Sequence, residues 1–169
     1  MRQQIINNFS CVAKLLTFTV VTIINILLIS AGLLLQLSGL AQSNYEELSG
    51  DALKFAPLET AQALANTLLS AQKAGQPYLL KNSEAIATVQ KEFTTEKQSQ
   101  TYSAIRDLFG DYQSITFEQA FRTTTNPTYY IFRFRGEFKR NNAQPEVRVV
   151  MNEAKQLAGF SIVPWQNSL

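Results

Sequence analysis

The spacing of apolar positions changes twice along the chain. Residues 15–35 form one uncharged, mostly apolar run of 21 residues. From Leu58 to Gly110, apolar residues recur at helical spacing, which predicts helices. Beyond Gly110, apolar and polar residues alternate, which is typical of strands with one buried face. The pattern therefore predicts helices first and a sheet after them.

Three helices are expected between the apolar run and the sheet. The clearest begins after Pro57, whose missing N–H suits the first turn of a helix, and ends at Gly75. A second, shorter helix is expected after Ser83, which can cap it. A third begins at Thr94 or Thr95, because a glutamine three residues after Thr95 gives the spacing of a capping box.

Four strands are expected after the helices, and short connections require neighbouring strands to be antiparallel. One face of this sheet is apolar, and the helices are expected to cover it. The fold class is therefore α+β, with about three helices packed on a curved, four-stranded antiparallel meander. The residues expected to face the helices are Ile115, Phe117 and Phe121, then Tyr130, Phe132, Phe134 and Phe138, then Val147, Val149 and Met151, and last Ala158, Phe160 and Ile162.

Residues 1–41 are expected to be a signal peptide or a signal anchor. Arg2 and Lys14 precede the apolar run, so the N-terminus is expected to face the cytoplasm. A run of this length can span a membrane, which favours an anchor. Small residues at 39 and 41 favour cleavage after Ala41 instead. The protein is thus expected outside the cytoplasm, either periplasmic or secreted, or tethered to the inner membrane through residues 15–35.

The rest of the chain divides into three parts. Residues 42–56 are polar with isolated apolar positions and are expected to be a linker. Residues 57–165 form the expected α+β domain, and residues 166–169 form a tail. This length is enough for one hydrophobic core.

The composition argues against several kinds of catalytic and metal-binding site. The chain has no histidine, and its only cysteine, Cys11, precedes the apolar run. The predicted domain therefore lacks the commonest general base, a thiol nucleophile and the usual soft metal ligands, and no catalytic set, metal or cofactor is expected. Beyond residue 41 the chain has 13 basic and 13 acidic residues, so nucleic-acid binding is not expected either.

Two stretches carry a resemblance to a known family. IRDLFGDYQSI at residues 105–115 and VRVVMNEAKQLAGFSIVPW at residues 147–165, together with the helix 57–75, resemble small exported bacterial domains of the nuclear-transport-factor-two-like, or cystatin-like, superfamily. The resemblance covers about residues 58–165. It implies a sheet that wraps a helix into a cone, and many members of the group have no assigned activity.

Two functions are compatible with these observations. The first is an extracytoplasmic, non-catalytic binding or interaction module for an unidentified small molecule or envelope protein. The second is a small cone-fold enzyme of the isomerase, dehydratase or hydrolase type, which would need a carboxylate in its cavity. The carboxylates considered are Asp107, Asp111, Glu118 and Glu137, and the positions of the first three fit turn or surface residues better.

Two groups of residues are candidate binding sites. The basic residues Arg133, Arg135, Lys139 and Arg148 could attract an anionic partner, although an ordinary solvated strand face explains them as well. Aromatic residues with polar tips could line a ligand pocket at the open end of the cone, or they could close the core instead. These pocket candidates are Tyr102, Tyr130 and Trp165.

Overall fold

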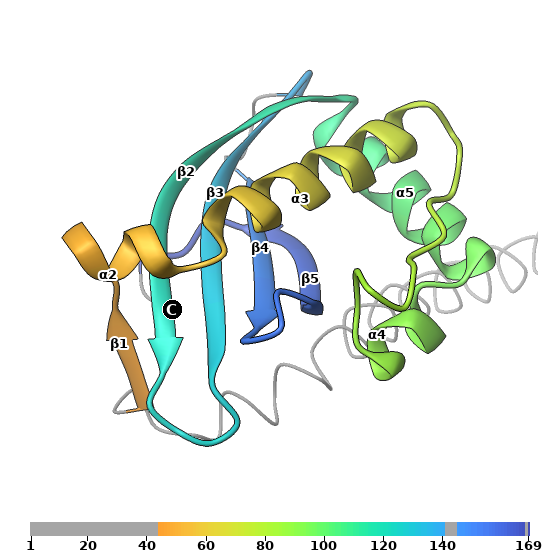
Figure 1. Ribbon diagram of the computed structural model, residues 1–169. Helices are drawn as coiled ribbons and strands as arrows, with labels where there is room; N and C mark the ends of the chain where they lie inside the picture. The colour runs from red at the N-terminus through yellow and green to blue at the C-terminus, as the bar shows by residue number, and fades with distance from the viewer. Residues whose placement is uncertain (1–43, 141–144, 168) are drawn as a thin grey trace, which may run out of the picture. The chain divides into compact units, whose positions relative to one another are not determined.

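Four helices and a five-stranded antiparallel sheet make up the part of the chain that the computed structural model describes, residues 44–140, 145–167 and 169 (Figure 1). In chain order the elements are β1 (Tyr45–Glu47), α2 (Gly50–Phe55), α3 (Leu58–Lys73), α4 (Ala87–Glu92), α5 (Thr95–Phe109), β2 (Tyr112–Thr123), β3 (Tyr129–Phe138), β4 (Pro145–Asn152) and β5 (Leu157–Pro164). The expected signal peptide or anchor lies outside the described residues. Within the described ranges, no helix is long and apolar enough to cross a membrane.

The sheet follows chain order, β1-β2-β3-β4-β5, and every neighbouring pair is antiparallel. The expected α+β class and the antiparallel meander of β2 to β5 are confirmed. The strand order follows from the short turns, because a short turn can join a strand only to an antiparallel neighbour. The alternation of apolar and polar residues makes each strand present its apolar residues to the same side of the sheet.

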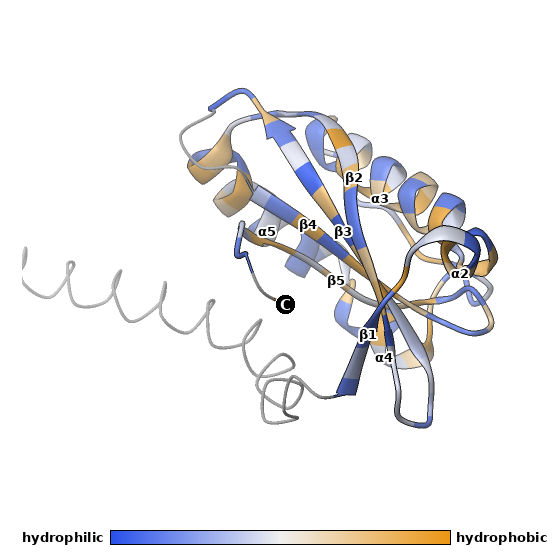
Figure 2. Ribbon diagram, turned by 90° about the vertical axis from the view of Figure 1, so that its left-hand side faces the viewer, coloured by the Kyte–Doolittle hydropathy of each residue, from blue (hydrophilic) through white to orange (hydrophobic). Residues whose placement is uncertain are grey.

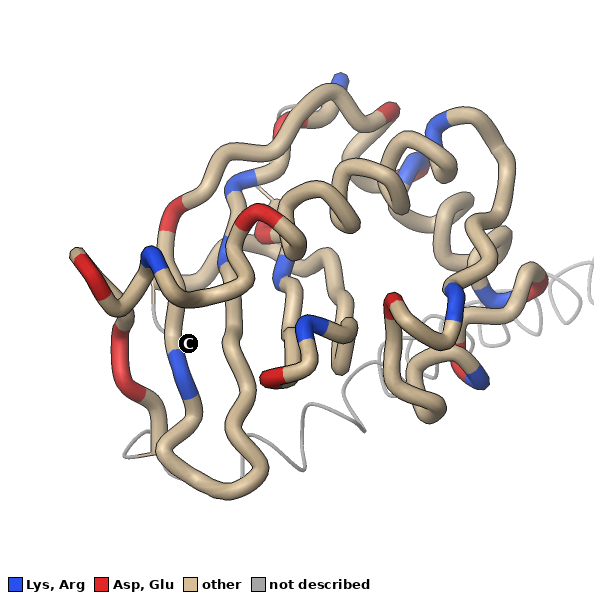
Figure 3. The backbone as a smooth tube through the Cα atoms, in the orientation of Figure 1, with Lys and Arg blue, Asp and Glu red and all other residues tan. Residues whose placement is uncertain are grey.

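The segment expected to be a linker is instead part of the fold. Residues 45–47 form β1, which pairs with the end of β2, and the backbone N–H of Leu48 donates to the carbonyl of Ala120 at 2.8 Å. Leu48 is only 5% exposed. The acidic stretch of β1 lies beside a basic position of β2 (Figure 3), where Glu46 and Arg122 form an ion pair at 2.9 Å. Residues 44–56 therefore belong to the same compact unit as the domain expected at residues 57–165.

Helix α3 lies across one face of the sheet and supplies most of the helical part of the core (Figure 1). Its inward residues recur three and four positions apart, so they share one stripe of the helix surface. Those buried residues are Ala61, Leu64, Ala65, Leu68 and Leu69. They belong to the same buried cluster as Phe132, Phe134, Val147 and Val149 of the sheet, none of which has accessible surface.

The start of α5 differs by one residue from the expected capping box. Thr94 is the N-cap, and its hydroxyl accepts a hydrogen bond from the N–H of Lys97 at 3.3 Å. The glutamine of the expected box, Gln98, is buried and serves another role, described below. The helix ends at Gly110, as expected, where φ is +81° and a Cβ would meet the backbone nitrogen of Arg140 at 3.0 Å.

A β-bulge in β2 changes which residues face the core. Phe117 pairs with Phe134, but Gln119 pairs with Arg133, so Glu118 is an extra residue in β2. The alternation of faces shifts by one position after it. Ala120, 1% exposed, therefore enters the core, and Phe121, expected there, does not belong to the buried cluster.

Loss of residues 42–56 should measurably destabilise the domain. We expect a chain that begins at residue 57 to lose at least about 2 kcal/mol of unfolding free energy relative to one that begins at residue 42, because burial of Leu48 and the β1 pairing are lost. Urea unfolding of both chains measures this difference. In the longer chain, Leu48→Ala should reproduce most of the loss, whereas Phe55→Ala, at a position 86% exposed, should have little effect. Equal stability of the two chains would show that β1 is dispensable.

Candidate functional site

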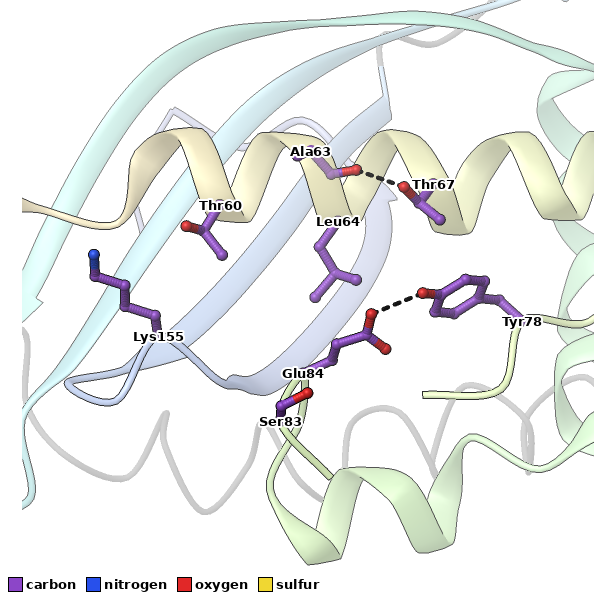
Figure 4. Close-up of a pocket in the computed structure, with 8 residues that line it drawn as sticks. All are labelled: Thr60, Ala63, Leu64, Thr67, Tyr78, Ser83, Glu84 and Lys155. Atoms are coloured by element: carbon purple, nitrogen blue, oxygen red, sulfur yellow. Dashed lines mark hydrogen bonds between the residues drawn. The ribbon is translucent and has the colours of Figure 1, made fainter. Parts of the chain in front are cut away.

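An open hollow of about 250 Å³ lies between α3, the segment before α4 and the turn that joins β4 to β5 (Figure 4). It is lined by Thr60, Ala63, Leu64 and Thr67 of α3, by Tyr78, Ser83 and Glu84 of the segment before α4, and by Lys155 of the turn. Leu64, 8% exposed, belongs to the core cluster, so the bottom of the hollow is apolar. Three parts of the chain far apart in sequence thus meet around one small space.

Glu84 is held in a fixed orientation at one end of this hollow. The Tyr78 hydroxyl donates to one carboxylate oxygen at 2.8 Å, and the backbone N–H of Lys81 donates to the other at 2.9 Å. Removal from water would raise the pKa of Glu84, but the hydrogen bonds from Lys81 and Tyr78 hold this pKa below its usual value. The same hydrogen bond to Glu84 raises the pKa of the Tyr78 phenol. At neutral pH the site therefore presents a charged carboxylate and a protonated tyrosine.

The backbone of Glu84 is fixed by the start of β5. Its carbonyl accepts a hydrogen bond from the N–H of Leu157 at 2.7 Å, and the carbonyl of Leu157 accepts one from Ile86 at 3.0 Å. Ala85 thereby forms an isolated parallel bridge with Leu157. This bridge places the carboxylate of Glu84 relative to the sheet.

The backbone of Tyr78 is fixed by one buried side chain, that of Gln98. The Gln98 amide donates to the carbonyls of Tyr78 and Phe93, and its oxygen accepts from the Tyr78 N–H at 3.0 Å and from the Tyr102 hydroxyl at 2.6 Å. A glutamine amide has two donors and two acceptor positions, and all four are used here. Tyr78 is therefore held both through its backbone and through its hydroxyl.

Lys155 lies at the other end of the hollow in an unusual backbone conformation. Its φ is +58°, in the left-handed region that favours glycine. The turn is closed by the side chain of Asn152, whose oxygen accepts from the N–H of Gln156 at 2.8 Å, and the Gln156 side chain donates to the Asn82 carbonyl at 2.9 Å. Among the described residues, the Lys155 ammonium has no hydrogen-bond or ion-pair partner.

The opposite face of the sheet holds a second polar cluster, centred on Arg133. Neither Arg133 nor Glu146 has accessible side-chain surface, and they form an ion pair at 2.5 Å. Arg133 also donates to the side chain of Gln119 at 2.6 Å, and the β2 bulge is what places this glutamine opposite it. Glu146 forms a second ion pair, with Arg148, at 2.6 Å. Burial raises the pKa of Glu146, but hydrogen bonds from Arg133 and Arg148 outweigh this effect and lower the pKa below its usual value.

The residues after β5 cover this cluster. The ring centroid of Trp165 lies 4.4 Å from the guanidinium carbon of Arg133 and 4.5 Å from that of Arg135, which is cation–π geometry. The carbonyl of Gln166 accepts a hydrogen bond from Arg133. Figure 2 shows the C-terminal end on the side of the sheet away from α3. The Nε of Arg133 is buried without a hydrogen-bond partner among the described residues.

The four basic candidates are each engaged by a carboxylate of the chain. Arg133, predicted to lie on a solvated or partner-binding face, is instead fully buried, because Trp165 and Gln166 pack over it. Arg148 pairs with Glu146 and opposes Arg133 in the register of β3 and β4. The remaining pairs are Arg135 with Glu118 at 2.8 Å and Lys139 with Asp111 at 2.8 Å.

The three pocket candidates are not brought together. Tyr130 pairs with Met151 and packs against the core on the helix-covered face, whereas Trp165 lies on the other face. Tyr102 bonds to Gln98 and supports the segment that carries Tyr78. None of the three lines the hollow described above. The separation of Tyr130 from Trp165 follows from strand alternation, because Trp165 packs over Arg133, and the side chains of Tyr130 and Arg133 lie on opposite faces of β3.

Little in the sequence pattern points to the residues that line the hollow. Glu84 and Lys155 stand in connecting segments, and their approach depends on the bridge between Ala85 and Leu157, which periodicity does not reveal. The described residues contain no group of three or more His, Cys, Asp or Glu side chains that could hold a metal ion.

In comparisons with known proteins, no family model matches the sequence, and no curated protein or solved structure matches it.

Breaking the buried ion pair should cost far more stability than removing an exposed charge. We expect Arg133→Met to lower the free energy of unfolding by about 3–5 kcal/mol, because it leaves Glu146 charged and buried with one fewer partner. Chemical denaturation measures the loss. Lys91→Met, at an exposed position of α4, is the control and should leave the midpoint nearly unchanged. A small loss at Arg133 would mean that the cluster is open to water.

Acid should weaken the fold partly through Glu146. The folded-state pKa of Glu146 lies below the unfolded value, so its ion pairs stabilise the protein above the ordinary carboxyl pKa of about 4.3. This contribution is lost as the pH falls through the folded-state pKa. Thermal unfolding from about pH 6 down to about pH 2 should show a falling midpoint, and Glu146→Gln should flatten part of that fall. The pKa values of Glu84 and Asp111 are also lowered, so protonation of these two carboxylates should account for the rest of the fall in melting temperature. An unchanged slope in Glu146→Gln would argue against the assigned coupling.

Proposed function

We propose that this chain is an extracytoplasmic, non-catalytic binding module that takes a small polar molecule into the hollow beside α3. The resemblance to the nuclear-transport-factor-two-like superfamily supports a cone-like description, in which α3 is the helix that the meander wraps. The uncharged run at residues 15–35 supports export or membrane tethering, with the domain outside the cytoplasm.

The observation that carries the proposal is the oriented carboxylate of Glu84. Both of its oxygens accept hydrogen bonds, from Tyr78 and from the backbone of Lys81. It lines the same hollow as Thr60, Ser83 and Lys155, beside the apolar side chain of Leu64. A few fixed polar groups around an apolar surface are typical of small-molecule sites.

The electrostatics of Glu84 favour binding over catalysis. A general base works best when its pKa lies near the operating pH, and the pKa of Glu84 is shifted the other way. The phenol of Tyr78 is a weaker acid than usual for the same reason. The enzyme alternative needs a cavity carboxylate, and Asp111 and Glu118 are instead paired with Lys139 and Arg135.

A fragment screen with a variant that fills the hollow tests this function. In amide NMR spectra of the chain that begins at residue 42, water-soluble amines, carboxylic acids, polyols and zwitterions would be added one by one. We expect at least one class to shift signals of residues 60–67, 78–84 and 155. Ala63→Trp, at an exposed α3 position in the hollow, should abolish these shifts, and Ser70→Trp, exposed on α3 outside the hollow, should not. Shifts that survive Ala63→Trp, or no shifts at all, would contradict the proposal.

A further inference from the structure

We propose that the hollow selects a small zwitterion, whose ammonium group binds Glu84, whose acidic group binds Lys155 and whose apolar body lies on Leu64. This inference rests on the proposed binding function and names the class of ligand. Figure 4 shows the three side chains in this order, with Lys155 at one end, Leu64 in the middle and Glu84 with Tyr78 beyond it.

The Glu84 end accepts hydrogen bonds and cannot donate them. An ionised carboxylate has about four lone-pair positions. The two hydrogen bonds from Tyr78 and the Lys81 backbone use one position on each oxygen, and the Lys81 ammonium forms an ion pair with the oxygen that Tyr78 bonds, at 3.8 Å and so beyond hydrogen-bond distance. The side chain of Glu84 remains 25% exposed, so a ligand can reach the free positions. An ammonium group supplies both the donors and the positive charge that these positions favour.

The Lys155 end has the opposite preference. Its ammonium is unpaired among the described residues, so it can meet an acidic group without breaking another contact. The backbone of Lys155 gives a second reason to assign a role to this residue. A φ of +58° costs conformational free energy in a residue other than glycine. Residues in such backbone conformations cluster at active sites and ligand-binding sites.

The space between the two charges limits the size and the shape of the ligand. A hollow of about 250 Å³ lies below the range of about 300–1,000 Å³ that is usual for drug-sized ligands. The Thr67 hydroxyl already donates to the Ala63 carbonyl at 2.9 Å, so it offers a ligand only an acceptor. A simple anion would bring its charge toward Glu84, and a simple cation would bring its charge toward Lys155. A zwitterion matches both ends.

Matched ligands test the charge requirement. The ω-amino acids 4-aminobutanoate, 5-aminopentanoate and 6-aminohexanoate, which carry the ammonium and the carboxylate at opposite ends of an apolar chain, would be titrated into the chain that begins at residue 42, followed by amide NMR. The analogues hexanoate and pentylamine keep the apolar chain of 6-aminohexanoate but lack the amine and the carboxylate, respectively. We expect at least one amino acid to bind about tenfold or more tightly than either analogue, because each analogue forfeits one charge-assisted contact.

Matched variants test the two residues. Glu84→Gln and Lys155→Gly should each weaken binding of the best amino acid about tenfold or more. Lys155→Gly should at the same time raise the melting temperature, because glycine relieves the left-handed backbone. This pairing separates loss of binding from loss of folding. Glu96→Gln and Lys91→Met, which change exposed charges outside the hollow, should leave the affinity unchanged.

Failure of this inference and failure of the proposed function have different signatures. If the amino acids bind no better than both analogues, or if Lys155→Gly binds them as the parent chain does, the zwitterion assignment is wrong. Fragment shifts that Ala63→Trp abolishes would then still support a binding module for another class. If no compound gives shifts that Ala63→Trp abolishes, both proposals fall together.

Discussion

The structure depends on the contact between α3 and the inner face of the sheet. Ala61, Ala65, Leu68 and Leu69 have no accessible surface, and small and large side chains alternate along this stripe. The alanines let the helix approach the strands, and the leucines fill the space on either side. Because four of the residues that line the hollow stand on the same helix, the packing of α3 in the core also sets the position of one wall of the site. Core packing and binding geometry are therefore coupled through one rigid element.

The outer face is stabilised by another principle. Arg133 and Glu146 are removed from water together, and such a pair is favourable only while both partners and their hydrogen bonds are present. Trp165 and Gln166 complete this environment, so these two residues after β5 are part of the folded domain. Each of the four basic candidates on the strands is paired with a carboxylate of the chain, which makes the hollow beside α3 the better candidate for recognition.

Alternation and capping rules predicted much of the fold from local sequence. They placed Phe132, Phe134 and Phe138 in the core and the helix before Gly75 correctly. They failed for Phe121, because a bulge adds one residue to a strand without changing its composition. They failed for Arg133 because alternation gives the face of a residue but not what covers that face. These rules could not predict the hollow, because only the tertiary structure brings Glu84 and Lys155 together around one space.

The fully satisfied amide of Gln98 constrains how this sequence can vary. Glutamate has the same length but offers no donor, so it would leave two backbone carbonyls unbonded and place a charge beside them. Asparagine carries the same groups on a shorter side chain. A related sequence that replaces this glutamine would therefore need a different path for residues 76–80, and the two changes should appear together. Position 98 thus marks, in any relative, whether the wall that carries Tyr78 has been kept.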